Sequence, residues 1–261
     1  MRWRYLVFVG ALAWPALLLC GQARAEDLVA LYRAYWAGMP AAVIRLGLHD
    51  GAGDYRYEIA IRSEGLAHLV TRFQGHAVSE GRLAAGKAPE PARYDAIYDL
   101  KKRHDRHLSM RFVTRAGAVF ADRGPDDTSR KPPLAEQFRK SVIDPISVLT
   151  LIRDRLRRHV AGLFTIPVYD GARRFDVVTQ MLPRKGDNDS VLRLQLTLRP
   201  VAGFKGETSE DGDPDTSPRQ VELQMTDDAR LLPLSMSVPL YYLPLLVQFD
   251  RVCTADRPCP E

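Results

Sequence analysis

The sequence has few cysteines, and it lacks the short motifs that place reactive side chains at fixed spacing. Its 261 residues include three cysteines, too few for a disulfide-dense scaffold. It has no Gly-x-Ser-x-Gly or Ser-x-x-Lys segment and no glycine-rich loop ending in Lys-Ser or Lys-Thr. These absences exclude the familiar serine-nucleophile and phosphate-loop signatures. We therefore predict a protein that is not an enzyme and that needs no cofactor.

Histidine is also scarce, and its spacing does not predict a metal site. Of the six histidines, only His104 and His107 lie close together in the sequence. They fall among alternating polar and apolar residues, and on a strand two positions three apart face opposite sides of the sheet. We therefore expect two solvated histidines and no bound metal.

The chain carries no strong excess of either charge. There are 37 basic and 32 acidic residues, but Arg2, Arg4 and Arg24 lie in a segment that we expect to be removed, which would leave 34 against 32. The basic residues are scattered among acidic ones, without the arginine or lysine block that marks a nucleic-acid surface. We expect no nucleic-acid partner.

The longest apolar run occurs once, at the N terminus. A basic start is followed by the apolar residues 5–20 and by small residues at Ala23 and Ala25. This order predicts a secretory signal peptide over residues 1–25, cleaved before Glu26, and hence a periplasmic protein. The alternative is a retained anchor, but the run is shorter than the roughly 20 residues that span a bilayer and contains Pro15. A lipoprotein signal is rejected because Leu19, a large residue, precedes Cys20.

Removal of this segment leaves residues 26–261, with neither repeats nor a long low-complexity linker. We expect one β-rich domain. Only Cys253 and Cys259 remain, and in an oxidising compartment two such cysteines form one local disulfide.

Alternation of polar and apolar residues predicts most of the structure. It is clear over residues 55–62, 108–112, 174–181, 192–199 and 221–225, while residues 38–40 predict a hairpin turn between two further strands. One apolar face and one polar face per strand is typical of an antiparallel sheet. Two polar stretches, residues 121–133 and 203–218, are predicted to be mobile surface loops.

Helical patterns are rare. Asp144 and Pro145 form a helix-start signal, and apolar residues at helical spacing continue to Val160. We predict one main helix over residues 144–160 and a shorter one over residues 64–72.

Four segments, taken in order, resemble an exported proteobacterial family catalogued as domain of unknown function 3108. They are Tyr35-Trp36-Ala37-Gly38-Met39-Pro40-Ala41, Ser63-Glu64-Gly65-Leu66 with Phe73, Asp144-Pro145-Ile146-Ser147, and Val168-Tyr169-Asp170-Gly171-Ala172-Arg173-Arg174-Phe175-Asp176. The resemblance implies an exported β-rich domain without known catalytic residues. Structural roles suit residues of these segments better than chemical ones: tight turns at Gly38 and Gly171, a helix cap at Asp144, and a pairing of Arg173 or Arg174 with Asp176 or with a neighbouring strand.

With about ten strands and so few helices, the apolar faces must cover one another. Two packed layers would do this, as would a curled sheet partly closed by the helix. We predict the second: a mainly β fold with a large curled antiparallel sheet, half-barrel or barrel-like. Its apolar groove would bind or carry a lipid or envelope precursor. The predicted lining comprises Leu192, Leu194, Leu196, Leu198, Val221, Leu223, Met225, residues 234–238, Leu149 and Ile152.

Two other functions remain open. An envelope scaffold or assembly accessory would use loops or a sheet edge to bind a protein partner. A hydrolase without a recognisable motif would need a polar cleft with perturbed carboxylates or histidine.

Overall fold

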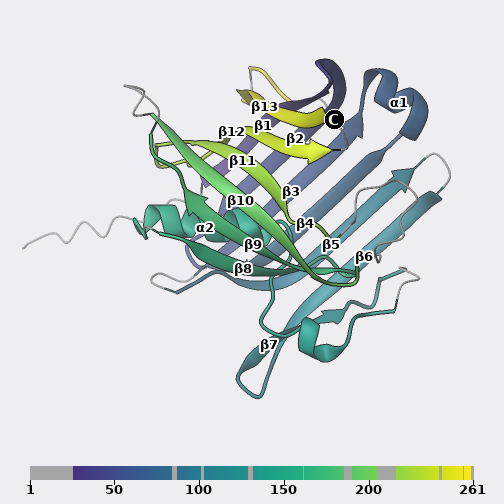
Figure 1. The fold of residues 1–261 in the computed structure, drawn as a ribbon, viewed down its shortest axis with the longest axis vertical. Coiled ribbons are helices and arrows are strands. Elements are labelled where there is room, and N and C mark those ends of the chain that lie inside the picture. The colour runs from purple at the N-terminus through teal and green to yellow at the C-terminus, as the bar shows by residue number, and fades with distance from the viewer. Residues whose placement is uncertain are drawn as a thin grey trace, which may run out of the picture.

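The structure, a computed structural model, describes residues 26–83, 87–100, 103–128, 132–160, 162–184, 190–204, 216–240, 243–254 and 256–259. The predicted signal peptide lies outside these ranges. Thirteen strands form one sheet, with α1 (Gly65–Thr71), α2 (Ser147–Arg157) and a 3₁₀ turn (Glu136–Phe138) beside it (Figure 1). The strands are β1 (Glu26–Trp36), β2 (Met39–Asp50), β3 (Asp54–Ser63), β4 (Gln74–Arg82), β5 (Glu90–Leu100), β6 (Arg103–Arg115), β7 (Ala118–Arg123), β8 (Phe164–Tyr169), β9 (Arg174–Met181), β10 (Val191–Ala202), β11 (Arg219–Thr226), β12 (Pro233–Leu240) and β13 (Leu243–Val252).

The sheet consists of two meanders joined side by side. Its order is β7-β6-β5-β4-β3-β2-β1-β13-β12-β11-β10-β9-β8, and each neighbouring pair is antiparallel. Strands β1 and β13, from the two ends of the described chain, pair at the centre of the sheet. The sheet curls until β7 and β8 approach each other, which confirms the predicted mainly β, barrel-like fold.

The connection from β7 to α2 bridges the two edge strands. Lys140 forms an antiparallel bridge with Phe120 of β7, and three residues later Ile143 forms a parallel bridge with Val168 of β8. Backbone hydrogen bonds that would otherwise face solvent at both edges are thereby made.

The β8–β9 turn closes the same seam further along. Gly171 has a φ of +90°, and a side chain there would meet Leu108 of β6, whose Cδ1 would lie 2.3 Å from an added Cβ. Glycine is therefore required both by the backbone and by the close approach.

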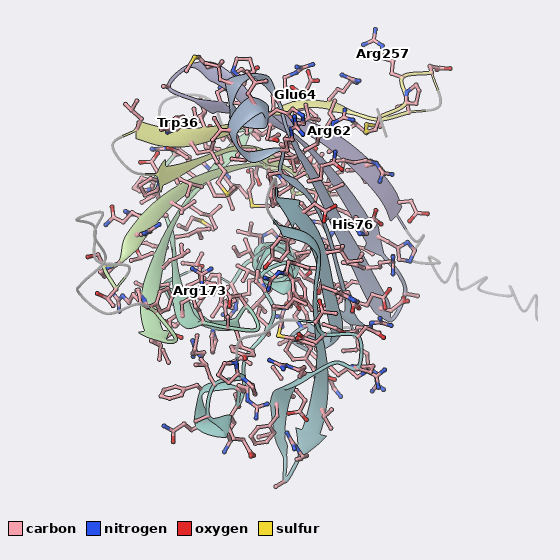
Figure 2. All side chains as sticks on the ribbon, turned by 90° about the vertical axis from the view of Figure 1, so that its right-hand side faces the viewer. Trp36, Arg62, Glu64, His76, Arg173 and Arg257 are labelled. Carbon is pink, nitrogen blue, oxygen red and sulfur yellow. A yellow bond between two sulfur atoms is a disulfide. The ribbon has the colours of Figure 1, made fainter. Side chains whose placement is uncertain are left out.

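Helix α2 lies inside the barrel, between the two halves of the curled sheet (Figure 2). Ile146, just before the helix, belongs to a core built largely from β1–β6. Ile152 belongs to a second core built from β8–β11. A single amphipathic helix thus fills the space that facing β-sheets would otherwise have to fill with their own side chains.

Most predicted elements are confirmed, with corrections at their limits. The turn at Gly38 and the short helix over residues 64–72 are present, the latter as α1. The main helix runs over Ser147–Arg157 rather than residues 144–160, because a turn at Pro145 and Ile146 precedes it and a further turn follows Arg157. The predicted loop over residues 121–133 was wrong at its start: Ala121 is fully buried in β7. Residues 129–131 and 205–215 of the two predicted loops lie outside the described ranges.

Candidate functional site

The residues predicted to line a ligand groove lie together on the inner face of β10, β11 and α2. Seven of the nine named residues are buried, with Leu149 and Leu198 partly buried. Their neighbours in this cluster include Ile166 and Val177 of β8 and β9. Because α2 packs over them, they form a protein core, and their assignment as ligand contacts stays a prediction.

A buried carboxylate fixes the start of α2. Asp144 is fully buried, and its Oδ1 accepts the backbone N–H groups of Ile146 and Ser147, both at 2.9 Å. Its Oδ2 accepts the hydroxyls of Ser79, at 3.0 Å, and Ser147. Tyr55 of β3 completes the cluster, with its hydroxyl 2.8 Å from Ser147 Oγ. Burial raises the pKa of Asp144, and the hydrogen bonds from Ser147, Ser79 and the backbone oppose that rise.

A buried ion pair fixes the second half of α2. The Arg153 side chain is 3% exposed, and its Nη1 lies 2.9 Å from Asp50 Oδ2 at the end of β2. The guanidinium also donates to the hydroxyl of Tyr57 and, at 2.8 and 3.2 Å, to the carbonyl of Arg230. Arg157 donates to the same Asp50 oxygen at 2.6 Å. Burial alone would raise the pKa of Asp50, but Arg153, Tyr57 and Arg157 together hold it below its ordinary value.

Beyond the end of α2, the barrel opens into a pocket of about 540 Å³, which we call the mouth pocket. Its apolar wall comes from β9, β10 and the segments that follow α2 and β11, and it grades from core to surface: Leu192 and Leu231 are 8% and 5% exposed, whereas Val160 and Met181 are 38% and 40% exposed. Polar and charged residues surround this wall, namely Arg157, His159, Arg184, Asp227 and Asp228. Of the nine named groove residues, Leu192 alone lines this pocket.

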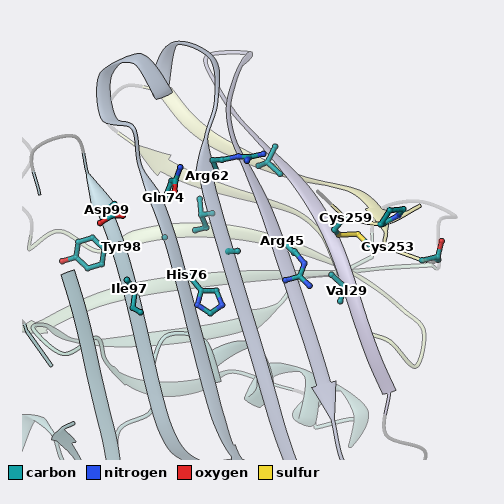
Figure 3. A pocket seen from close by; sticks show the side chains of 16 residues that line it. Val29, Arg45, Arg62, Gln74, His76, Ile97, Tyr98, Asp99, Cys253 and Cys259 are labelled. Atoms are coloured by element: carbon teal, nitrogen blue, oxygen red, sulfur yellow. A yellow bond between two sulfur atoms is a disulfide. The ribbon is translucent and has the colours of Figure 1, made fainter. Parts of the chain in front are cut away.

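A larger hollow, of about 820 Å³, crosses the outer face of β1–β5. Most of its lining side chains, such as Arg45, His76 and Ile97, alternate along their strands with core residues and so point away from the barrel interior. Figure 3 shows this outer groove from Asp99 at one end to the disulfide at the other. His76 and Arg45 both pair with Glu58, at 2.9 and 3.4 Å. The lining is therefore a mixture of ion-paired and apolar groups.

The predicted disulfide is present and lies at this groove. Cys253 and Cys259 are bonded, with Cα atoms 5.4 Å apart. Cys253 N–H donates to the Val29 carbonyl at 2.8 Å, so the disulfide loop is held against β1.

The buried ion pair that fixes the second half of α2 is the main feature that the sequence reading missed. At 100° per residue, Arg153 lies 40° from Leu149 and 60° from Leu156 around the helix, within the apolar stripe. A charge inside such a stripe indicates a buried partner, and this signal was overlooked. The partner itself, Asp50, lies 103 residues away and no sequence pattern connects the two.

The described ranges contain neither a metal-binding cluster nor a membrane-spanning helix. No group of three or more histidine, cysteine or acidic residues there could hold a metal ion. Within the same ranges, no helix is long and apolar enough to span a membrane.

The predicted ion pair near the β8–β9 turn is found for Arg174, whose Nη1 lies 2.8 Å from Asp176, while Arg173 pairs with Asp170.

Comparison with known proteins gives a family and a related fold. No curated protein matches the chain. A solved structure described as a β-barrel-like protein of domain of unknown function DUF1849 from Brucella abortus is similar in fold, with a TM-score of 0.53 and 10% identity over 88% of this chain and 98% of that one. Residues 31–237 match the family described as protein of unknown function (DUF3108). The chain therefore belongs to the DUF3108 family.

Proposed function

We propose that this protein is an exported binding protein that holds an amphiphile, a lipid or envelope precursor, with its apolar part in the mouth pocket. The observation that carries the proposal is the apolar wall that runs from the core residues Leu192 and Leu231 to the exposed Met181 and Val160. Export rests on the signal-peptide pattern of residues 1–25.

The dimensions and charges of the mouth pocket support a small amphiphilic ligand. Its volume of about 540 Å³ falls within the roughly 300–1,000 Å³ typical of ligand sites. Arg184 is paired with Asp227 at 2.6 Å, and Arg157 with Asp50 at 2.6 Å. A charged head group would lie beside these pairs and remain hydrated, while the chain would contact the apolar wall.

The interior offers less room for such a ligand than the mouth. A ligand lying along Leu194 and Leu223 would have to displace α2, which is held by Asp144 at one end and by Arg153 at the other. Binding at the mouth requires no such displacement.

The test measures lipid and a probe separately. Protein purified from periplasm is extracted with organic solvent for mass spectrometry, and delipidated protein is titrated with dansyl-labelled undecanoic acid. We expect extracted lipid and saturable probe binding. Met181→Glu and Val160→Glu should each weaken probe binding by at least about tenfold, because a carboxylate would be placed against the chain.

Val201→Glu serves as the matched control, since Val201 is 46% exposed but lies at the other end of β10. Equal binding by parent, mouth variants and control would show that the probe binds elsewhere. Absence of both extracted lipid and saturable binding would refute the proposed function.

The outer groove favours a second function, a scaffold or accessory protein that binds an extended polar segment of a protein partner. It is open, crosses five strands and carries both charge signs. A photo-crosslinking residue at Ile97, which is 47% exposed in the groove, should trap a defined envelope protein. The same residue at Val113, outside the groove and 40% exposed, should not.

A further inference from the structure

Large apolar side chains are exposed together at the end of the barrel opposite the mouth pocket. Strand β2 runs from Met39 at this end to Asp50, which contacts the mouth-pocket residue Arg157 at the other. We define the apolar rim as six residues with their exposed fractions: Trp36 40%, Met39 44%, Leu66 60%, Leu69 66%, Val70 72% and Leu243 47%.

These residues belong to one continuous edge. In the strand register, Trp36 pairs with Met39 on one side and with Leu245, close to Leu243, on the other. Helix α1 joins this edge because the N–H of Glu64 donates to the carbonyl of Ala41 at 2.8 Å. Figure 2 labels Trp36 and Glu64 at the same end of the barrel, and Figure 1 shows α1 extending beyond β3 and β4.

Packing within the chain does not account for the apolar face of α1. None of its seven residues is buried. Leu66, Leu69 and Val70 stand at positions i, i+3 and i+4, which share one side of a helix. A short exposed helix gains little stability from such residues, and a group of exposed apolar side chains of this kind is typical of a contact surface.

The strand ends beside α1 carry no charge. Residues 36–42 and 243–248, which comprise the end of β1, the turn at Ala37 and Gly38, the start of β2 and the start of β13, contain no charged side chain. Cations stand just behind them: Arg62 at the end of β3 and Arg72 after α1 are both exposed, and Arg72 forms no ion pair within the described ranges.

We propose that the apolar rim inserts into the surface of an anionic lipid bilayer. Helix α1, the end of β1 and the starts of β2 and β13 carry the apolar groups, and such a divided surface enters a deformable lipid interface more readily than it matches a flat protein surface. Tryptophan favours the membrane–water interface, and leucine and valine favour the acyl region below it. The arginines would contact the anionic head groups. The apolar rim is distinct from the mouth pocket, so docking of the rim on a membrane would leave the mouth pocket open.

Trp36 provides the test. The only other tryptophans are Trp3 and Trp14, so the full chain with both replaced by phenylalanine has a single tryptophan, which lies in the rim. Vesicles of phosphatidylglycerol and phosphatidylethanolamine containing dibrominated lipid quench tryptophan only on contact. We expect a blue shift and quenching of Trp36 at increasing lipid concentration, whether or not residues 1–25 also bind lipid.

The variants separate the apolar contribution to lipid binding from the electrostatic one. Leu69→Asp with Val70→Asp should weaken the quenching response by at least about tenfold. Arg72→Glu should weaken it by about fivefold on the anionic vesicles and leave it unchanged on phosphatidylcholine. Leu163→Asp, at a position as exposed as Leu69 (66%) but on the other end of the barrel, is the control and should match the parent.

Several outcomes would overturn the proposal. Trp36 could remain unquenched while the protein sediments with vesicles, which would assign binding to another segment. Equal quenching in the parent and the double variant would also assign lipid binding to another segment. A blue shift that depends on protein concentration without lipid, and that the double variant abolishes, would show that a second copy covers the rim instead.

Discussion

The contact between α2 and the barrel wall can be tested by replacing Arg153 with methionine. Methionine keeps much of the side-chain volume but removes the guanidinium. The change would break the ion pair with Asp50 and the hydrogen bonds to Tyr57 and to the Arg230 carbonyl. Asp50 would keep one cation, Arg157, whose side chain is 32% exposed.

The expected cost follows from burial. Removing one partner of a buried pair costs about 3–5 kcal/mol because the other charge is left without compensation. Since Arg157 still contacts Asp50, we expect Arg153→Met to lower the free energy of unfolding by about 3 kcal/mol. The matched control, Arg157→Met, removes a partly exposed cation from the same carboxylate and should cost about 1 kcal/mol or less.

Urea unfolding followed by circular dichroism would measure both variants. Adding Asp50→Asn to Arg153→Met should recover part of the loss, because the orphaned charge is then removed, with a coupling of about 2 kcal/mol. The ion pair between Arg153 and Asp50 should also make the free energy of unfolding depend on pH. Because the folded pKa of Asp50 is lowered, the stability it contributes is present at neutral pH and is lost as the pH falls below its ordinary value of 3.8. Equal costs for the two arginine variants would refute the assignment of α2 anchoring to Arg153.

Three further predictions concern the seam, the tail and the helix cap. Gly171→Ala should destabilise the protein by about 1–2 kcal/mol more than Gly38→Ala in thermal unfolding, because both have positive φ but only the former would press on Leu108. Replacing both C-terminal cysteines by serine should cost no more than about 2 kcal/mol in the same assay and leave the β spectrum unchanged, since the closed loop is small. For Asp144, whose folded pKa is raised, stability is lost as the pH rises above 3.8 toward the folded value. Asp144→Asn, which does not titrate, should therefore lose less stability than the parent as the pH rises above 3.8 in urea titrations.

The sequence predicted strands and helices correctly where apolar residues recur at the regular spacing of a strand or a helix. Leu192, Leu194 and Leu196 alternate and are all buried, and Asp144 acts as the predicted cap. The strand β7 was partly read as loop because its last residues, Ala121–Asp122–Arg123, carry one apolar side chain among charges. In the structure Ala121 faces the interior and the charged neighbours pair with other residues: Asp122, for example, accepts from Arg139 at 2.9 Å.

Closure of the barrel could not be predicted in the same way. Periodicity shows which side of a strand needs cover, but it does not identify the covering element. The seam depends on Gly171 meeting Leu108 and on Ile143 bridging to β8, which are contacts between segments far apart or of unremarkable composition. The apolar rim was missed for a related reason, because Leu66, Leu69 and Val70 have the spacing of an ordinary packed helix.

The location of α2 links the predicted groove to the proposed site. An apolar sheet face and an amphipathic helix can meet to form a core, or can stand apart and enclose a ligand, and the sequence is the same in both cases. Here the helix carries its own polar groups to the opposite wall: Ser147 to Ser79 and Arg153 to Asp50. Such buried contacts tolerate little displacement, because each separated partner would lose its hydrogen bonds without gaining water. The inner face of β10 and β11 is therefore committed to α2 for most of its length. Open apolar surface remains where the helix ends, beside Leu192, and that is where a ligand can bind without unfolding the core.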